Sequence, residues 1–470
     1  MTFIRLEKIF ILGLCLCAAM ICLTACGREK IVYNTEETEN NNETPLQQEI
    51  PEHIEEVINT ERGKITIDAD VLNVQNFEKL PAATVVIKDW SEQDIKNYAE
   101  AVFDKGSVEY VLPFWCWSMD DLMDEEAKVK EQIKELGFTE ETVANHPEYG
   151  YLEIKLLDLR FSIQSHDDSK VLENDGSFQW ISAEDGRMTC QAKGTINGQE
   201  YGMLAEKSDE DSRYSLSFFQ VKGEHYAEDD TGHFDIPGGR WLSPNSVVYN
   251  HNECKLSEQE AINRAQDFIN QMGIQDMTVS GVYQALRYMY NTDENGNVDA
   301  LQALNGYYVY FGRALQGCTT PAIKPYVAAY CYDTIKTETE GGSIEYSQGD
   351  SHYGYESIAV LVTDNGIEEF CYLNPMEVSE ELVEQSKVME FGKIYEIAKE
   401  YLQIHKMDCE IDTIRLCLGR VKYEDSYALI PVWSFEYNDS FDSVEWYPQA
   451  VLINAIDGSL IDADSGRPMN

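Results

Sequence analysis

Basic residues are scarce in this sequence of 470 residues, and their scarcity restricts the partners that the chain can bind. It contains 36 Lys and Arg against 84 Asp and Glu, which gives a formal net charge of −48. Such a surface repels nucleic-acid phosphates and anionic lipid headgroups, so neither is an expected partner. The same surface attracts cations and basic peptides, and it also favours solubility.

The sequence also lacks the short motifs by which many enzymes are identified. It has no HExxH zinc motif, no GxSxG nucleophile elbow, no SxxK pair and no CxxC pair. The triplet Gly349-Asp350-Ser351 is typical of some serine hydrolases, but here it lies in a Gly/Ser-rich loop late in the chain. We therefore expect a protein that is not an enzyme, and rank a cell-envelope hydrolase last among its alternatives.

Only one long apolar run occurs, and it lies at the N-terminus. Arg5 and Lys8 precede an apolar segment that extends from Ile9 to Leu23, which is short for a membrane span of about 20 residues. The segment ends in Leu23-Thr24-Ala25-Cys26-Gly27, which resembles the lipobox of bacterial lipoprotein signal peptides. That resemblance implies cleavage before Cys26 and attachment of diacylglycerol to its thiol. The alternative is an uncleaved anchor helix that happens to contain a cysteine.

The rest of the chain is predicted to be extracytoplasmic and anchored to the cell membrane by this lipid. Residues 26–62 are rich in Glu, Asn, Thr and Gln and have few apolar side chains, which predicts a disordered tether, with a short helix allowed near His53–Ile58. A polar stretch from Asp229 to Glu253 contains Pro237-Gly238-Gly239 and predicts a domain junction. We expect an N-terminal α+β domain over 63–250 and a C-terminal region over 251–470.

Four helices are predicted from apolar residues that recur every three or four positions. Ser91 and Ser257 are expected N-caps, and Glu260 completes a capping box with Ser257. The predicted helices are Ser91–Gly106, Ser118–Gly137, Ser257–Gly273 and Phe391–His405.

Strand-like runs follow these helices and are separated by strong turn signals. The turns are Asn197-Gly198, Asp364-Asn365-Gly366 and Asp457-Gly458. A helix followed by antiparallel strands occurs twice in the C-terminal region, over about 255–337 and 386–470. The fold class predicted is α+β, with antiparallel curved sheets each covered by a helix.

The end of the chain resembles known extracytoplasmic domains. The segments Tyr427-Ala-Leu-Ile-Pro-Val-Trp433 and Leu452-Ile-Asn-Ala-Ile-Asp-Gly458 are similar to the closing hairpin of PepSY-like and YycH/YycI-like domains. With the hairpin Val362-Thr-Asp-Asn-Gly-Ile367, they also resemble an uncharacterised family of Firmicutes lipoproteins. The resemblance implies a regulatory role through protein contact and supplies no catalytic residues. Unlike YycH/YycI-like proteins, this chain has a lipobox in place of a transmembrane helix.

One polar loop has the spacing of a calcium site. Oxygen-bearing residues alternate around Gly296, as they do in an EF-hand-type loop. Asn291 stands where the first aspartate belongs and Gln302 where the bidentate glutamate belongs, and both departures favour a polar hairpin connection instead. The candidate ligands are Asn291, Asp293, Asn295, Asn297 and Asp299.

Cysteines, histidines and aromatic clusters carry weaker signals. Eight cysteines follow Cys26 without metal-type spacing, which favours buried free thiols over one or two disulfides. His405 lies on an apolar helical face and is expected in the core. The cluster Phe114-Trp115-Cys116-Trp117 is expected to pack in a core, with a sugar-stacking platform as the alternative.

These features predict a non-catalytic regulatory or protein-interaction module that binds another envelope protein or a peptide. We expect its contact surface at the edges of the sheets, including the strand Pro431–Tyr437. A solute- or calcium-binding lipoprotein is the alternative, for which Ca²⁺ is the one cofactor considered.

Overall fold

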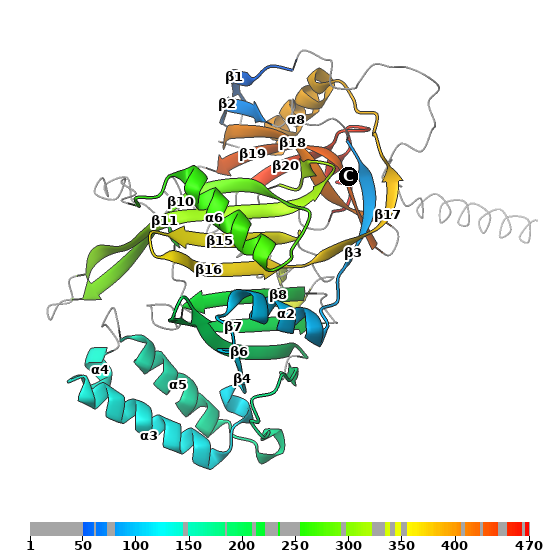
Figure 1. Cartoon of the computed structure of the whole chain (residues 1–470). Helices are drawn as coiled ribbons and strands as arrows, with labels where there is room; N and C mark the ends of the chain where they lie inside the picture. Colours follow the sequence, from blue (N-terminus) through cyan, green and yellow to red (C-terminus); the bar gives the residue numbers. More distant parts are fainter. Residues whose placement is uncertain are drawn as a thin grey trace, which may run out of the picture.

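The computed structural model describes residues 50–60, 63–72, 80–143, 149–183, 186–208, 213–220, 234–235, 254–292, 298–321, 334–338, 344–348, 355–405, 409–423, 426–439, 449–462 and 466–469. The fold is α+β, with two open and mostly antiparallel sheets that carry helices (Figure 1). The predicted fold class is confirmed. The leader, Cys26 and the tether up to residue 49 lie outside the described residues.

The larger sheet contains 11 strands and draws them from both halves of the sequence. Its order is β4 (Glu109–Val111), β6 (Met188–Ile196), β7 (Gln199–Ser208), β8 (Arg213–Gln220), β16 (Gly366–Leu373), β15 (Ser357–Thr363), β11 (Val298–Leu315), β10 (Met277–Thr292) and β9 (Phe234–Asp235). Two short strands join its sides: β5 (Ile181–Ser182) pairs with β6, and β12 (Cys318–Thr319) pairs with β11.

The smaller sheet contains 8 strands and is also assembled from both ends of the chain. Its order is β1 (His53–Asn59), β2 (Lys64–Leu72), β18 (Cys409–Tyr423), β19 (Ser426–Asp439), β20 (Gln449–Asn454) and β21 (Leu460–Ile461), with β3 (Ala82–Ile87) between β19 and β17 (Met376–Val383). The β2–β18 pair is parallel. A separate hairpin pairs β13 (Thr334–Glu338) with β14 (Ile344–Gln348).

Helices α2 (Glu92–Val102) and α6 (Glu258–Gln271) cover one face of the larger sheet and contact each other (Figure 1). Both begin with a capping box, formed by Ser91 with Asp94 and by Ser257 with Glu260. In each box the serine hydroxyl and the carboxylate satisfy backbone amides that lack helical partners. Helix α8 (Phe391–His405) packs on the smaller sheet, where the ring centroids of Phe391 and Trp433 are 4.6 Å apart.

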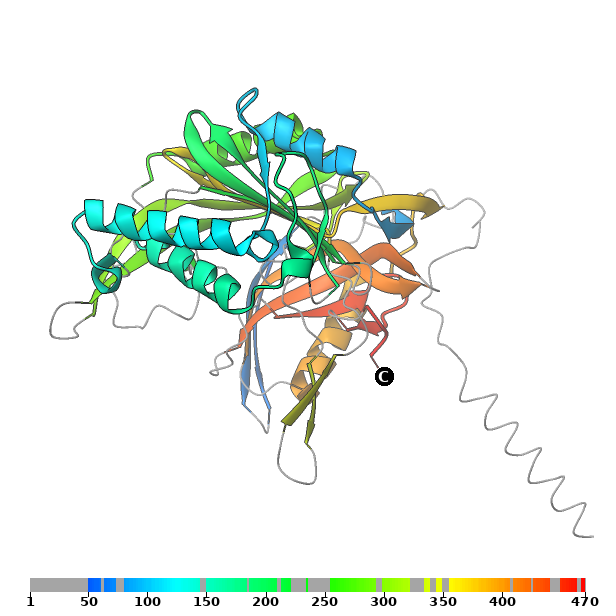
Figure 2. The same ribbon diagram turned by 90° about the horizontal axis from the view of Figure 1, so that it is seen from below.

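A helical hairpin lies beyond the β4 edge of the larger sheet in Figure 1, and Figure 2 shows its two long helices side by side from below. It consists of α3 (Met119–Glu135), α4 (Glu140–Val143) and α5 (Tyr151–Gln164), with the short 3₁₀ turns η1 (Phe114–Cys116) before it and η2 (Asp168–Lys170) after it. Its buried side chains form a cluster separate from the cores of the sheets. The hairpin is therefore a packing unit of its own.

The predicted turns are confirmed where they are described. Asn197 and Gly198 connect β6 to β7 with φ values of 52° and 77°, as the type I′ turn requires. The turn before Gly366 connects β15 to β16. All four predicted helices are present, as α2, α3, α6 and α8. Each of the last two is followed by an antiparallel hairpin.

The predicted division near residue 250 does not separate the sheets. Strand β8 pairs with β16, with Phe218 directly opposite Phe370, so both sides of the expected junction contribute to one sheet and one core. Likewise, β2 pairs with β18 and β3 with β17. The polar stretch signalled a long connection, but strand pairing between distant segments decides which residues share a core.

The predicted tether also ends earlier than expected. Residues 53–59 form β1, which pairs with β2 in full register from His53–Asp70 to Asn59–Lys64. Its Ile58 is buried in the core of the smaller sheet, which explains why this short polar segment is ordered as a strand and not as the helix considered. The strand expected at Pro431–Tyr437 is β19, and it lies inside the sheet with β18, β20 and β3 as partners. It therefore offers no free edge.

Candidate functional site

The predicted calcium loop connects two strands. Asn291 pairs with Asp299 and Thr292 pairs with Val298 at the end of the β10–β11 hairpin. Asp293, Asn295 and Asn297 lie outside the described residues. EF-hand loops are flanked by helices, so the local fold here is that of a hairpin connection, the alternative favoured by the sequence. Calcium binding at its tip stays a prediction.

The described part of the chain holds no group of three His, Cys, Asp or Glu arranged to bind a metal ion. Cys26, the Gly349-Asp350-Ser351 triplet and the side chain of His405 are outside the described residues. Within the same ranges, no helix combines the length and apolar character needed to cross a bilayer.

The described cysteines are free thiols, as the sequence favoured. Five are buried and two are partly buried: Cys116, Cys190, Cys318, Cys409 and Cys417 are the buried ones, and Cys254 and Cys371 the others. Burial raises the pKa of Cys190, Cys371 and Cys417 to about 12, so these thiols stay protonated and act as small apolar side chains.

A buried ionic network links the two sheets. The Arg313 guanidinium on β11 donates to both carboxylate oxygens of Glu356, from Nη2 to Oε1 at 2.7 Å and from Nε to Oε2. Its Nη2 also donates to the Met376 carbonyl at 3.0 Å, at the start of β17. The Tyr372 hydroxyl donates to Glu356 Oε1 at 2.7 Å. The network therefore spans from the larger sheet to the first residue of a strand in the smaller sheet.

Burial dominates the ionisation of this network. The Glu356 side chain is 0 % exposed, and burial raises its pKa while Arg313 and Tyr372 oppose that shift. Burial also raises the pKa of Tyr372 well above its usual value, and the neighbouring Glu356 adds to this. For Arg313, the contact with Glu356 outweighs burial, and the net pKa shift is upward. Because the carboxylate is enclosed and already hydrogen-bonded, its role is structural.

A second partly buried pair repeats this connection. Arg415 Nε on β18 lies 3.2 Å from Glu436 Oε1 on β19, and Arg415 Nη1 donates to the Ser280 carbonyl on β10 at 2.8 Å. Burial raises the pKa of Glu436, and the Arg415 charge opposes the shift. In both places an arginine paired with a carboxylate on its own side donates to a backbone carbonyl of the other sheet.

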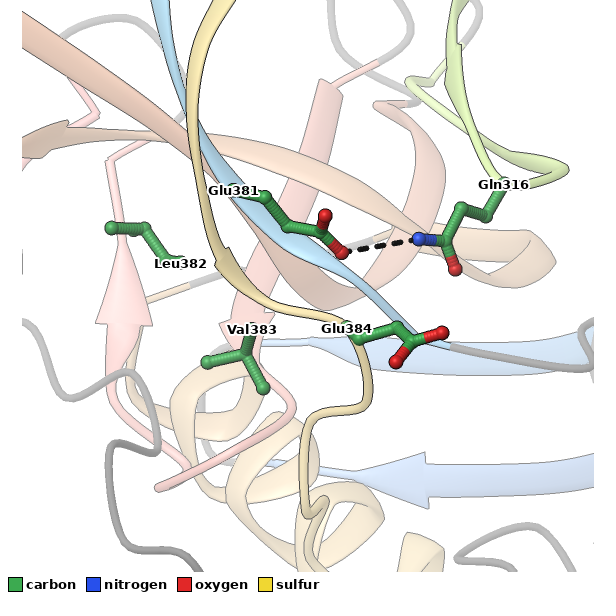
Figure 3. Close-up of a pocket in the computed structure, with 5 residues that line it drawn as sticks. All are labelled: Gln316, Glu381, Leu382, Val383 and Glu384. Atoms are coloured by element: carbon green, nitrogen blue, oxygen red, sulfur yellow. Dashed lines mark hydrogen bonds between the residues drawn. The ribbon is translucent and has the colours of Figure 1, made fainter.

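A depression of about 450 Å³ lies beside the end of β17 (Figure 3). Gln316 Nε2 donates to Glu381 Oε1 at 3.3 Å across it, and Glu384 is the second carboxylate in its wall. Leu382 and Val383 complete the five lining residues. This lining includes carboxylates but no histidine, serine, cysteine or lysine, so it does not provide a nucleophile with a base.

Helix α5 has two apolar faces, and only one of them is covered. Leu152, Leu156 and Leu159 are buried against α3 in the core of the hairpin. Leu157 and Phe161 are exposed, at 51 % and 71 % of their surface. At 100° per residue these two side chains lie on the side of the helix opposite the buried leucines. We call the exposed side of α5 that carries Leu157 and Phe161 the outer face.

Two further exposed apolar side chains lie on segments that flank the hairpin. The turn η1, which contacts α5, contains Trp115, whose surface is 38 % exposed. Leu172 is 41 % exposed, and its backbone amide donates to the Cys116 carbonyl at 3.0 Å, which places it beside η1. Phe114, Cys116 and Trp117 pack inward as expected, so only Trp115 of that cluster is left at the surface.

Helix α5 was missed in the sequence because it lacks a single apolar stripe. The segment Tyr151–Gln164 has apolar residues on two opposite sides, so its amphipathic period is weak. We would have predicted a helix that is buried on one side and exposed on the other by treating its apolar residues as two stripes, Leu152-Leu156-Leu159 and Leu157-Phe161.

Comparisons with known proteins add little to this geometry. No family profile matches the chain, and no curated protein matches it. A crystal structure of an uncharacterized protein from Eubacterium rectale ATCC 33656 is similar over 91 % of this chain and 96 % of that chain, with 12 % sequence identity and a TM-score of 0.42. A similarity of this degree carries no functional conclusion.

Proposed function

We propose that this chain is a lipid-anchored extracytoplasmic module that acts without catalysis, by binding another envelope protein. The observation that carries the proposal is the outer face of α5, where Leu157 and Phe161 are exposed on a helix already packed on its other side. Each such side chain gains about 1.5–3 kcal/mol when it is fully buried. Contiguous exposed apolar surface marks interaction sites, whereas apolar side chains scattered singly do not.

The remaining contacts support a structural scaffold around this face. The arginines of the two interior ion pairs connect the sheets through backbone carbonyls, and the carboxylates that take part are enclosed or engaged by arginine. The side of α5 opposite the outer face is packed in the core of the hairpin, with Leu152, Leu156 and Leu159 buried there.

Site-specific photo-crosslinking in intact cells tests the proposal. A photoreactive phenylalanine analogue at position 161 is expected to give one discrete crosslinked species, because that side chain is 71 % exposed at the centre of the outer face. The same analogue at position 57 is the matched control, since Val57 is 50 % exposed on β1. Equal crosslinking at both positions would contradict the proposal. So would a crosslink at position 161 that persists in the Leu157→Asp variant.

The anchoring part of the proposal rests on the segment that ends in Ala25-Cys26-Gly27. Cys26→Ala is expected to abolish lipid attachment and leave the leader uncleaved, because the thiol is the acylated atom in a lipobox. Mass analysis of the wild-type protein checks this directly. A wild-type chain that keeps an unmodified leader would contradict lipid anchoring and leave the crosslinking result untouched.

Calcium binding at the tip of the β10–β11 hairpin is the alternative function. Asn291 and Asp299 face each other across the pair, which brings the two ends of the candidate ligand set together. If calcium binds, it raises the unfolding temperature in proportion to occupancy, and Asp293→Ala abolishes the rise. No calcium-dependent rise in the wild-type protein would exclude this alternative.

A further inference from the structure

The dimensions of the outer face fit a single helix of a partner. Leu157 and Phe161 are four residues apart, so their side chains are neighbours one turn apart on the helix. Trp115 and Leu172 add apolar surface at the adjoining η1 turn. A narrow apolar stripe of this kind matches the anchors of an amphipathic helix, which recur every three or four residues.

The charge of the helical hairpin further restricts which partner helix can bind to the outer face. Residues 118–165, which span the helical hairpin, contain twelve Asp and Glu against five Lys and Arg, a net charge of −7. The two basic side chains of α5 are turned toward the other helices: Lys155 lies 2.7 Å from Glu125, and Arg160 lies 3.0 Å from Glu126 and 2.7 Å from Glu140. Asp158, which is exposed, stands between Leu157 and Phe161 in the sequence. The border of the outer face is therefore acidic.

We infer that the outer face of α5 receives an amphipathic helix whose apolar stripe is bordered by lysine and arginine, carried by the partner protein. This inference rests on the function proposed above and specifies the chemistry of the partner. The apolar stripe supplies the buried contact, and the basic border meets the acidic border of α5.

Charge argues against three other occupants. A second copy of the chain has the same formal charge of −48 and the same acidic border, so the two faces repel. An anionic membrane surface repels the hairpin for the same reason. The chain's own segment 27–49 contains six acidic and two basic residues, which makes it unsuited to this border.

A designed peptide gives a direct test. The probe is a labelled 18-residue Leu/Lys helix with leucine at heptad spacing, and its control is a scrambled isomer with the same composition and charge. The intact lipoprotein is held in nanodiscs of zwitterionic phosphatidylcholine, and empty nanodiscs serve as the blank. Binding of both peptides is measured by fluorescence anisotropy at two salt concentrations.

The expected result is a preference of at least about tenfold for the amphipathic peptide over its scrambled isomer, with the affinity of both peptides falling at the higher salt concentration because screening weakens their contact with the acidic border. The double variant Leu157→Ser/Phe161→Ser is expected to lose this preference, and Val57→Ser, a matched exposed position on β1, to keep it. Equal binding of the two peptides, or an unchanged preference in the double variant, would overturn the inference.

The remaining outcomes separate this inference from the proposed function. Crosslinking at position 161 without any peptide preference overturns the basic-helix chemistry and leaves the interaction role standing. Dimers seen by sedimentation, or binding to phosphatidylglycerol vesicles, that disappear in the double variant assign the outer face to a second copy or to lipid and overturn the inference. Peptide preference without any crosslink supports the chemistry of the face and counts against a resident partner in the cell.

Discussion

The body formed by the two sheets and the helical hairpin α3–α5 differ in how completely their helices bury apolar side chains. In the body, helix α6 has a single apolar stripe, and Ala261, Ala265, Phe268 and Ile269 are all buried against the larger sheet. In the hairpin, α5 buries one stripe and leaves Leu157 and Phe161 in solvent. The sheet covers the apolar side of α6, whereas α5 keeps a second apolar side exposed, and the interaction proposed above rests on that difference.

The largest effect is expected where the two sheets of the body are tied together. Glu356→Gln keeps the shape of the side chain but leaves the Arg313 charge buried without its counter-ion, which costs about 3–5 kcal/mol. The free energy of unfolding from urea denaturation measures it. The helical hairpin has no such buried pair in its described core, so its α3–α5 ion pairs at the surface are expected to contribute far less.

A double variant supplies the control for this prediction. Arg313→Met/Glu356→Leu removes both charges and is expected to regain most of the lost stability, because the uncompensated charge is gone. A cost below about 1 kcal/mol for Glu356→Gln would show instead that Glu356 is already protonated in the folded protein, the direction in which burial shifts its pKa.

The next largest effect tests whether the hairpin is a separate packing unit. Leu156→Ala opens a cavity between α5 and α3 and is expected to cost about 2–5 kcal/mol. Hydrogen exchange is expected to show lower protection of amides in α3 and α5 while those of α6 keep theirs. Phe370→Ala, in the core of the larger sheet, is the control and is expected to lower protection in α6. Equal loss in both regions from Leu156→Ala would mean one cooperative unit.

The same comparison explains what the sequence could predict. Helices α2, α3, α6 and α8 were predicted because their caps and single apolar stripes are local signals, and the hairpins at Asn197-Gly198 and Gly366 because positive φ requires particular residues. Helix α5 was missed because its second stripe cancels the periodicity. The sheets cross the expected division of the chain because pairs such as β8–β16 join residues more than a hundred positions apart, and no local pattern encodes such a pairing.

The candidate site followed the same rule. The calcium loop was predicted from a motif; the structure shows paired strands on either side of it, and calcium binding stays a prediction. The contact surface was expected at β19, which the structure places in the interior of the smaller sheet. Identifying the outer face of α5 requires knowing which of its two apolar stripes α3 covers. That information comes from the tertiary structure and not from the local sequence.

A smaller effect is expected at the edge of the body, where β1 begins. His53 Nδ1 lies 2.9 Å from Asp70 Oδ1 and Nε2 lies 3.1 Å from Asp68 Oδ1. The hydrogen bond to Asp70 raises the pKa of His53, so its contribution is complete below the unfolded value of about 6.5 and is lost as the pH rises through the higher folded value. Between these two pH values, amide hydrogen exchange in β1 is expected to speed up more than the intrinsic pH dependence of exchange accounts for. The His53→Gln variant is expected to show only the intrinsic rise in exchange rate.

The smallest effect on stability is expected from truncating Leu157, the residue that follows Leu156. Leu157→Ala changes a side chain that is 51 % exposed and is expected to alter the free energy of unfolding by no more than about 0.5 kcal/mol. Leu156→Ala, one position earlier, removes the same atoms from a side chain that is 0 % exposed. Thermal unfolding of the two variants side by side therefore measures how differently the two faces of α5 are used. If Leu157→Ala destabilised the protein as much as Leu156→Ala, the outer face would already be covered within the chain, and a partner would have no apolar surface to bind there.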